Sequence, residues 1–294
     1  MTTKIEMFTG KGGVGKTTMS VAGALHHSRS GRTLLISTDP SGSLSEIFAR
    51  PLDQKVTEVG NNLEVVELTR RLVLDLWREK FADEIYAVLS AFLPVGREII
   101  DYIEGAPGID EEFMLDYLLT AARSGRYETI VWDTAPTVTT LNLLFIQRLF
   151  YSHLTQAQKV YIRVKNVFSR VDPLALINQW LELTAAIIEM LKNDTRSWVV
   201  ANPERLPVEQ ALDIAASLAD FGIGINGFIL NKLLPGEVCA GSSFWEEKYS
   251  RQQGWREYLR ERAACPVREI PDLAGELSCP ESLAKVSSLL YPAG

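Results

Sequence analysis

A glycine-rich segment near the start of the chain constrains its fold more than any other feature. Gly10-Lys-Gly-Gly-Val-Gly-Lys-Thr17 matches the pattern Gly-x-x-x-x-Gly-Lys-Thr. It follows a strand-like run, Ile5–Thr9, and precedes a helix-like run that starts near Thr17 and ends before Gly31. In this context the glycines let backbone N–H groups turn inward around phosphate oxygens, and the helix N-terminus adds its dipole. The segment therefore predicts a phosphate-binding loop between a buried strand and a helix.

Strand-like and helix-like runs alternate along most of the chain. The expected strands are short and apolar, as in a sheet that helices cover on both faces. They are Ile5–Thr9, Thr33–Ser37, Leu63–Leu68, Tyr127–Trp132, Trp198–Ala201 and Gly227–Asn231. We therefore predict an α/β fold with a doubly wound, mostly parallel sheet around a P-loop NTPase core, in a single domain over residues 1–294.

Two longer helix-like stretches do not fit this simple alternation. The first, residues 69–122, has apolar residues at helical spacing, namely Trp77, Phe81, Ile85 and Leu89. The second, residues 141–195, contains the runs Asn142–Tyr151 and Pro173–Leu191. We expect the two stretches to form a helical subdomain mounted on the sheet.

Two local patterns predict where helices begin. Ser43-Leu-Ser-Glu46 has the form of a capping box. Asp110, after Pro107-Gly108, is placed to cap a helix that ends at Gly125. The inward residues of that helix are expected to be Phe113, Met114, Tyr117, Leu118 and Ala121.

Composition and charge narrow the classes of protein to which the chain can belong. Hydrophobic residues make up 46% and charged residues 23%, as in soluble globular proteins, and the formal net charge of −7 argues against nonspecific binding to nucleic acid. The most apolar stretch, Ala211–Leu230, is interrupted by Asp213 and Asp220. The glycine-rich loop begins at Gly10, where a signal peptide would need an apolar run. We therefore expect a cytoplasmic protein with no integral membrane segment and no nucleic-acid partner.

The phosphate loop contains side chains suited to a bound nucleotide. Lys16 is placed to neutralise charge on the β- and γ-phosphates, and the Thr17 hydroxyl is placed to ligate Mg²⁺. Lys11 is unusual, because the pattern requires no second lysine there. The residues expected to bind nucleotide in this segment are Gly10, Lys11, Gly12, Gly13, Val14, Gly15, Lys16, Thr17 and Thr18.

Two aspartates end strand-like runs and should lie at the same edge of the sheet as the loop. They are Asp39, in Ser37-Thr-Asp-Pro40, and Asp133, in Trp132-Asp-Thr-Ala-Pro136. Either one alone could simply cap a turn. Beside a phosphate loop, Asp39 is the better candidate for orienting an attacking water and Asp133 for the Mg²⁺ shell. We expect the metal site to comprise Thr17, Asp39 and Asp133.

Four motifs in this order resemble the ArsA/Get family, which comprises arsenite-pump ATPases and tail-anchored-protein targeting ATPases. They are Gly10–Thr18, Ile36-Ser-Thr-Asp-Pro40, Pro107-Gly-Ile-Asp-Glu111 and Asp133-Thr-Ala-Pro-Thr137. The resemblance extends from Ile5 to about Leu144 and again from about Trp198 to Leu283. It implies an ATP-hydrolysing homodimer that uses ATP and Mg²⁺.

The resemblance also implies roles for individual residues. It implies that Lys11 reaches the nucleotide of the partner subunit; the alternative is that Lys11 is a solvated loop lysine. It also implies that Lys11, Lys16 and Asp39 are catalytic. Asp39 resembles the hydrolytic switch I aspartate and Asp133 the metal-sensing aspartate of switch II. Asn231 lies where the family contacts adenine, although it could equally be a turn former. The segment 270–276, with Pro271 and Leu273, resembles the loop on the other side of the base.

Several departures from the family pattern bear on function. Cys239, Cys265 and Cys279 form no CxxC pair and all lie late in the chain, so neither a zinc-bridged dimer nor arsenite binding is expected. Val138-Thr139-Thr140 stands where the family usually has Gly-His-Thr. The candidate client helices contain a single methionine, Met190, among apolar residues that could equally be core: Leu143, Leu144, Phe145, Ile146, Leu149, Phe150, Leu174, Leu176 and Ile177.

These observations favour a dimeric Mg-ATP switch that captures or targets an apolar membrane-protein client. Two alternatives stay open. One is the ATPase subunit of an anion or metalloid (arsenite) extrusion system. The other is a partitioning or positioning ATPase, which usually needs a basic surface or a C-terminal amphipathic helix that Ser282–Gly294 does not offer.

Overall fold

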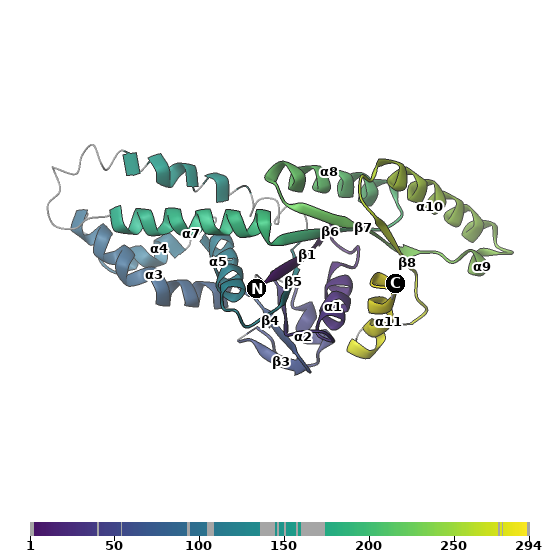
Figure 1. Ribbon diagram of the computed structural model, residues 1–294, viewed down its shortest axis with the longest axis horizontal. Coiled ribbons are helices and arrows are strands. Elements are labelled where there is room, and N and C mark those ends of the chain that lie inside the picture. Colours follow the sequence, from purple (N-terminus) through teal and green to yellow (C-terminus); the bar gives the residue numbers. More distant parts are fainter. Residues whose placement is uncertain are drawn as a thin grey trace.

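The computed structural model describes residues 3–39, 41–53, 55–92, 95–104, 109–135, 145, 147–149, 151–156, 158–159, 174–275, 277 and 279–292. Its centre is an eight-stranded sheet in the order β3-β4-β2-β5-β1-β6-β7-β8 (Figure 1). The strands are β1 (Lys4–Gly10), β2 (Thr33–Ser37), β3 (Thr57–Gly60), β4 (Leu63–Glu67), β5 (Thr129–Asp133), β6 (Thr195–Ala201), β7 (Gly224–Leu233) and β8 (Val267–Pro271). All neighbouring strands are parallel except β3 and β4. The predicted doubly wound α/β fold is therefore confirmed.

The helices fall into three groups around the sheet (Figure 1). One face of the sheet is covered by α1 (Lys16–His27), α2 (Ser43–Ile47) and α11 (Pro280–Leu290). Part of the other face is covered by α8 (Arg205–Phe221) and α10 (Ser243–Arg262), near the short α9 (Gly236–Cys239). The third group extends from one side of the sheet and consists of α3 (Arg70–Phe92), α4 (Glu98–Glu104), α5 (Ile109–Arg123) and α7 (Leu174–Asn193).

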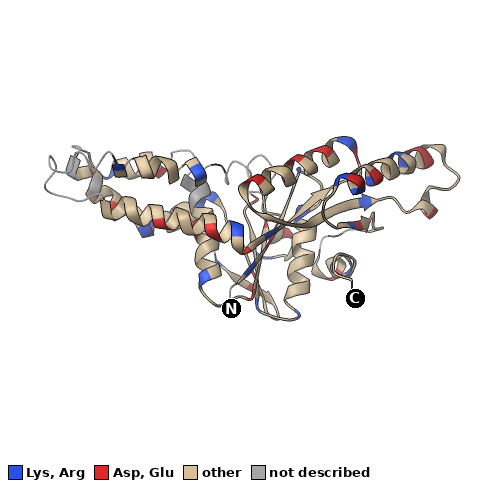
Figure 2. Cartoon of the chain, turned by 45° about the horizontal axis from the view of Figure 1, so that its top comes forward, with Lys and Arg blue, Asp and Glu red and all other residues tan. Residues whose placement is uncertain are grey.

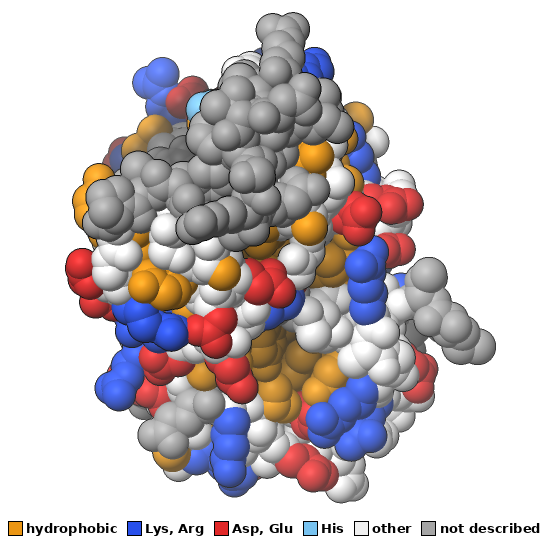
Figure 3. Space-filling model, turned by 90° about the vertical axis from the view of Figure 1, so that its left-hand side faces the viewer, with side chains coloured by type: hydrophobic (Ala, Val, Ile, Leu, Met, Phe, Trp, Pro, Cys, Tyr) orange, Lys and Arg blue, Asp and Glu red, His pale blue; other side chains and the backbone are white. Residues whose placement is uncertain are grey.

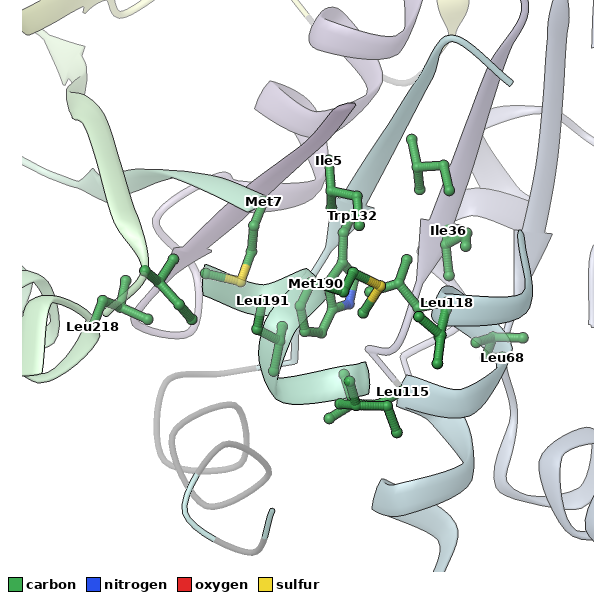
Figure 4. Close-up of a cluster of buried hydrophobic side chains, with 14 of the residues drawn as sticks. Ile5, Met7, Ile36, Leu68, Leu115, Leu118, Trp132, Met190, Leu191 and Leu218 are labelled. Carbon is green, nitrogen blue, oxygen red and sulfur yellow. The ribbon is translucent and has the colours of Figure 1, made fainter. Parts of the chain in front are cut away.

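Alternation along β1 shows why the strands read as continuous apolar runs. Ile5 and Met7 point to the core shared with α3, α5, α7 and α8, whereas Phe8 points to the core shared with α1, α2 and α11. Figure 4 shows the first of these cores, with Met190 of α7 and Leu118 of α5 gathered near the indole of Trp132. Because both faces are covered, nearly every residue of the central strands is buried.

The two outer strands, β3 and β8, were not predicted. In β3, Thr57-Glu-Val-Gly60, half-buried residues alternate with exposed ones, and β8 contains the charged residues Arg268 and Glu269. Edge strands lie against a neighbour on one side only, so they do not carry the apolar run that identifies a central strand. Pro271, expected in a loop, is the last residue of β8.

The helix-like spacing of residues 69–122 is confirmed. Trp77, Phe81 and Ile85 of α3 are buried, and the rings of Phe81 and Phe113 lie 5.1 Å apart between their centroids. In the second stretch, Pro173–Leu191 corresponds to α7, while most of the expected helix Asn142–Tyr151 lies outside the described residues.

Among the described helices, α7 is long and apolar enough to cross a membrane by length and composition alone, with a mean hydropathy of 1.3. Figure 2 shows that it carries few charged residues, whereas α10 carries both signs along its length. The C-terminal half of α7 nevertheless belongs to the core, because Ile187, Met190 and Leu191 are buried there.

Both predicted helix caps are wrong, although both helices exist. Helix α5 begins at Ile109, so Asp110 lies in its first turn and not at the cap. Helix α2 has Gly42 at its N-cap, and Ser43 is its first helical residue. The first turn of α2 is capped from a distant strand, because the Leu44 N–H donates to Glu67 Oε1 at 2.7 Å. A short-range pattern could not reveal an acceptor 23 residues away.

A buried carboxylate ties the C-terminal helix to the strand that carries the phosphate loop. Glu6 of β1 accepts hydrogen bonds from the Tyr291 hydroxyl (2.6 Å) and the Trp198 indole N–H (2.7 Å), and His27 Nε2 lies 2.8 Å from it. Burial raises the pKa of Glu6, but these partners outweigh it and hold the pKa below its ordinary value. The ends of α1 and α11 are therefore joined at one point of the central strand.

Candidate nucleotide and metal site

The phosphate loop leaves β1 at Gly10 and enters α1 at Lys16, as the sequence predicts. Two glycines are required by what surrounds the loop. A Cβ on Gly10 would lie 2.3 Å from the carbonyl oxygen of Val200 in β6. Gly15 has a φ of +95°, and a Cβ there would lie 2.4 Å from the side-chain nitrogen of Asn231 in β7. The loop is thus packed closely against two neighbouring strands.

Lys16 is buried within this loop, and its ammonium lies near two carboxylates. Its Nζ donates a long hydrogen bond of 3.4 Å to the carbonyl of Lys11. Burial lowers the pKa of the Lys16 ammonium, while the charges of Asp133 and Asp39 oppose that shift. Because an ammonium has three donors, the group retains capacity for phosphate oxygens.

Asp133 ends β5 and joins three elements through one carboxylate. It is fully buried, and its Oδ2 accepts hydrogen bonds from the Thr17 hydroxyl of α1 (2.9 Å) and the Ser37 hydroxyl of β2 (3.2 Å). Its Oδ1 is buried without a hydrogen-bond partner among the described residues. Burial raises the pKa of Asp133 to about 6; the Thr17 bond and the Lys16 charge oppose that rise and the Asp39 charge adds to it.

The residues around Asp133 fit a magnesium ion bound together with phosphates. Mg²⁺ prefers oxygen ligands and is usually held by one or two carboxylates plus substrate phosphates. The Thr17 hydroxyl and the unpaired Asp133 Oδ1 provide such oxygens next to the loop. No group of three or more His, Cys, Asp or Glu side chains that could hold a metal occurs among the described residues. The site would therefore need phosphate oxygens to complete a metal shell.

Asp39 lies in a segment that is bound to the end of β5. The N–H of Thr38 donates to the Asp133 carbonyl at 2.9 Å, and the Trp132 indole donates to the Thr38 hydroxyl at 3.1 Å. The Asp39 carboxylate accepts the N–H of Ser41 at 3.0 Å and is half-exposed. Its charge acts on both Lys16 and Asp133, so the structure brings the three predicted charged groups into one neighbourhood. Lys11, on the loop, is also half-exposed.

Asn231 makes a contact that sequence reasoning missed. Its side-chain amide donates to the carbonyl of Val14 at 2.8 Å and is buried against Gly15. Asn231 thereby braces the phosphate loop, and its contact with an adenine base stays a prediction. Pro271 pairs with Leu233, two residues beyond Asn231 on the adjacent strand, and Leu273 packs against the core that contains Val14.

The bond between Ser37 and Asp133 was also missed, for a similar reason. These residues are opposite each other because β2 and β5 are parallel neighbours in register. Strand order and register are properties of the assembled sheet, and no local spacing in the sequence encodes them.

We expect Asp133→Asn to stabilise the nucleotide-free, metal-free protein at pH 8 by about 1 to 3 kcal/mol. The pKa of Asp133 is about 6 in the folded state, above its ordinary value of 3.8. Between these two pH values the folded protein binds more protons than the unfolded chain, so the stability of the wild type falls as pH rises through this range. Asparagine does not ionise and avoids this fall. Urea unfolding at about pH 4 and pH 8 measures the difference, with the exposed Asp53→Asn as control. An Asp133→Asn protein that is less stable than wild type at both pH values would contradict the expectation.

Comparison with known proteins agrees with this geometry over nearly the whole chain. The family model described as anion-transporting ATPase matches residues 3–292. A putative arsenical pump-driving ATPase 2 of Aquifex aeolicus is 34% identical over 242 residues, covering 79% of this chain and 81% of that protein. The ATPase get3 of Neurospora crassa is 29% identical over 315 residues, covering 96% of this chain and 88% of the relative.

The family also contains proteins much longer than this one. The arsenical pump-driving ATPase of Escherichia coli is 27% identical over 255 residues, and the matched region covers 84% of this chain but only 42% of that protein. The match across residues 3–292 joins the phosphate loop, the two strand-end aspartates and the helical segments in one family pattern. The chain therefore belongs to the anion-transporting ATPase (ArsA) family and is an ATP-hydrolysing enzyme.

Proposed function

We propose that the chain is a cytoplasmic, nucleotide-gated homodimer that couples Mg-ATP hydrolysis to the capture of an apolar membrane-protein client. The observation that carries the ATPase part is the buried Asp133 carboxylate, which holds the Thr17 hydroxyl and keeps one oxygen unpaired beside Lys16. In this proposal the loop N–H groups and Lys16 bind the phosphates. Mg²⁺, held by Thr17 and the Asp133 shell, would neutralise charge on the β- and γ-phosphates.

Asp39 has the surroundings required to orient an attacking water. Its carboxylate is half-exposed, so water reaches it. The Asp39 N–H donates to the Ser37 hydroxyl, and the carboxylate accepts the N–H of Ser41. A carboxylate held in this way accepts a hydrogen bond from water and aligns it with the γ-phosphate. Lys11, also on the exposed side of the loop, would supply a cation to the site of the second subunit.

The client part of the proposal rests on the helical segments that extend from the sheet. Tyr102, Phe145 and Leu149 are exposed there, with 79%, 56% and 59% of their surface accessible. Figure 3 shows hydrophobic side chains between charged ones on this end of the molecule. Of the apolar residues considered for a client groove, Met190 belongs to the core, Leu174, Leu176 and Ile177 are half-buried, and Leu143, Leu144, Ile146 and Phe150 lie outside the described residues.

A second candidate function, the ATPase subunit of an arsenite extrusion system, is favoured by the names of the Aquifex aeolicus and Escherichia coli relatives. The cysteines argue against metalloid binding in this chain. Cys239 is buried in α9, Cys265 lies two residues before β8, and Cys279 immediately precedes α11, so the three are placed by three separate segments of the chain. Arsenite stimulation of hydrolysis that is lost when all three cysteines become serine would support this second function.

We expect Asp39→Asn to reduce kcat by about 100-fold or more while Mg-ATP binding is retained, because the variant loses the water-orienting carboxylate and keeps the phosphate loop. Steady-state hydrolysis and equilibrium nucleotide binding measure the two quantities. Asp53→Asn, an exposed aspartate after α2, serves as the matched control. Wild-type kcat in Asp39→Asn would refute the role of Asp39.

The same variant tests the client. Because it should remain in the ATP-bound state, it should retain bound partners for identification by mass spectrometry. Enrichment of proteins with a single C-terminal transmembrane segment supports a targeting role, and enrichment of one polytopic membrane protein supports a pump subunit. Recovery of the second subunit alone would remove the client from the proposal and leave the ATPase.

We expect Lys11→Ala to lower kcat far more than nucleotide affinity, with Lys4→Ala, at the other end of β1, as control. Mixing Lys11→Ala with Asp39→Asn tests action between subunits. In a mixed dimer, one of the two sites combines an intact Asp39 with the Lys11 of the other subunit. Because about half of the dimers in an equimolar mixture are mixed, the two inactive variants together should recover about a quarter of wild-type activity. No recovery in verified mixed dimers would show that Lys11 acts within its own subunit or not at all.

A further inference from the structure

The short helix α2, just after Asp39, depends on a carboxylate from another part of the sheet. Its N-cap residue, Gly42, has no side chain with which to bind the free N–H groups of the first turn. Glu67, the last residue of β4, supplies the acceptors. One of its oxygens accepts the N–H of Leu44 at 2.7 Å, and the other accepts the hydroxyl of Ser45 in a short hydrogen bond.

Further hydrogen bonds reinforce this attachment. The Ser45 hydroxyl also accepts the N–H of Leu52 at 3.1 Å, and the N–H of Glu67 donates to the carbonyl of Leu52 at 2.8 Å. Glu67 is only 4% exposed. A buried carboxylate must be matched by donors, so moving α2 away from Glu67 would leave a buried charge without partners. The start of α2 and residue 52 are therefore fastened to the end of β4.

The strand that carries Glu67 also holds the other end of the segment that contains Asp39. Glu67 pairs with Ser37 in the parallel register of β2 and β4, and the N–H of Leu68 donates to the Ser37 carbonyl at 2.8 Å. Ser37 in turn accepts the N–H of Asp39 at 3.2 Å. The segment between Ser37 and Leu44 is thus fixed at both ends by the consecutive residues Glu67 and Leu68.

Within that segment, contacts lead from the α2 end back to Asp39. The hydroxyls of Ser41 and Ser43 are 2.8 Å apart, and the N–H of Ser41 donates to the Asp39 carboxylate at 3.0 Å. Among the residues that the structure describes, Glu67 forms no hydrogen bond with the phosphate loop, and its two carboxylate oxygens are bonded to α2. Its influence on chemistry would therefore pass through the position of Asp39.

We propose that Glu67 is a positioning residue for ATP hydrolysis, which anchors α2 and thereby sets where the Asp39 carboxylate lies relative to the γ-phosphate. This inference rests on the proposed role of Asp39 in orienting water. A group held within a fraction of an ångström of its productive position contributes to rate through alignment, so loosening its anchor lowers kcat before it lowers nucleotide affinity.

The test compares Glu67 variants with a matched control on the same strand. Glu67→Ala removes both acceptors, and Glu67→Gln keeps an oxygen for the Leu44 N–H. Ser45→Ala removes one partner of Glu67 and is a milder second variant in case Glu67→Ala does not fold. The control is Glu64→Gln: Glu64 is also 4% exposed and multiply bonded, but to Arg32, Arg126 and Tyr127 at the other end of β4.

We expect Glu67→Ala to lower kcat by about tenfold or more while the Kd for Mg-ATP changes by less than about threefold. Glu67→Gln and Ser45→Ala should also lower kcat, but by less than Glu67→Ala does. Glu64→Gln should lower the melting temperature without lowering kcat at a temperature where it is folded. Glu67→Ala combined with Asp39→Asn should be no slower than Asp39→Asn alone, because both changes act through the same carboxylate.

Three results would overturn the inference. The first is a wild-type kcat in folded Glu67→Ala or, if that variant does not fold, a wild-type kcat in both Ser45→Ala and Glu67→Gln. The second is an equal loss of kcat and nucleotide affinity in the Glu67 variants, and the third is a kcat loss in Glu64→Gln equal to theirs. Failure of the underlying proposal has a different signature. If Asp39→Asn itself hydrolyses ATP at the wild-type rate, the role of Asp39 fails. If Asp39→Asn is inactive and the Glu67 variants are normal, only the role of Glu67 fails.

Discussion

The site depends on one buried carboxylate, that of Asp133, shared between the Thr17 and Ser37 hydroxyls. Burying a carboxylate costs free energy unless donors or a cation compensate, and here two hydroxyls and the nearby Lys16 ammonium compensate only in part. The raised pKa and the unpaired Oδ1 are two signs of the same shortage. A divalent cation between this oxygen and a nucleotide would complete the compensation. The Asp133 carboxylate therefore forms one part of a metal site that a bound nucleotide would complete.

The surrounding sheet places that carboxylate by register. Asp133 lies opposite Ser37 on β2 and Phe8 on β1, and the phosphate loop leaves β1 two residues later at Gly10. The loop is packed against Val200 of β6 and braced by Asn231 of β7, the next two strands on one side of β1. Glu67 and Leu68 of β4 extend the same arrangement to the segment that carries Asp39. The chemistry therefore sits at the carboxyl ends of six neighbouring parallel strands, β4, β2, β5, β1, β6 and β7.

Sequence reasoning succeeded where the signal is local and failed where it depends on strand order. The phosphate loop, the central strands and the buried face of α3 follow from spacing within a few residues. Asp39 and Asp133 were found because each lies at the end of a buried, apolar strand-like run. The cap of α2 by Glu67, the Asn231–Val14 bond and the Ser37–Asp133 bond join residues 23, 217 and 96 positions apart. The edge strands β3 and β8 escaped because their exposed sides carry polar residues.

The most direct test of this account is a crystal structure of the protein with Mg²⁺, ADP and aluminium fluoride, which imitate the phosphoryl group in transfer. We expect the metal on the Thr17 hydroxyl, the Asp133 carboxylate in its coordination shell and the Asp39 carboxylate beside the attacking water. A metal held away from Asp133, with Asp133 still bonded only to Thr17 and Ser37, would contradict it.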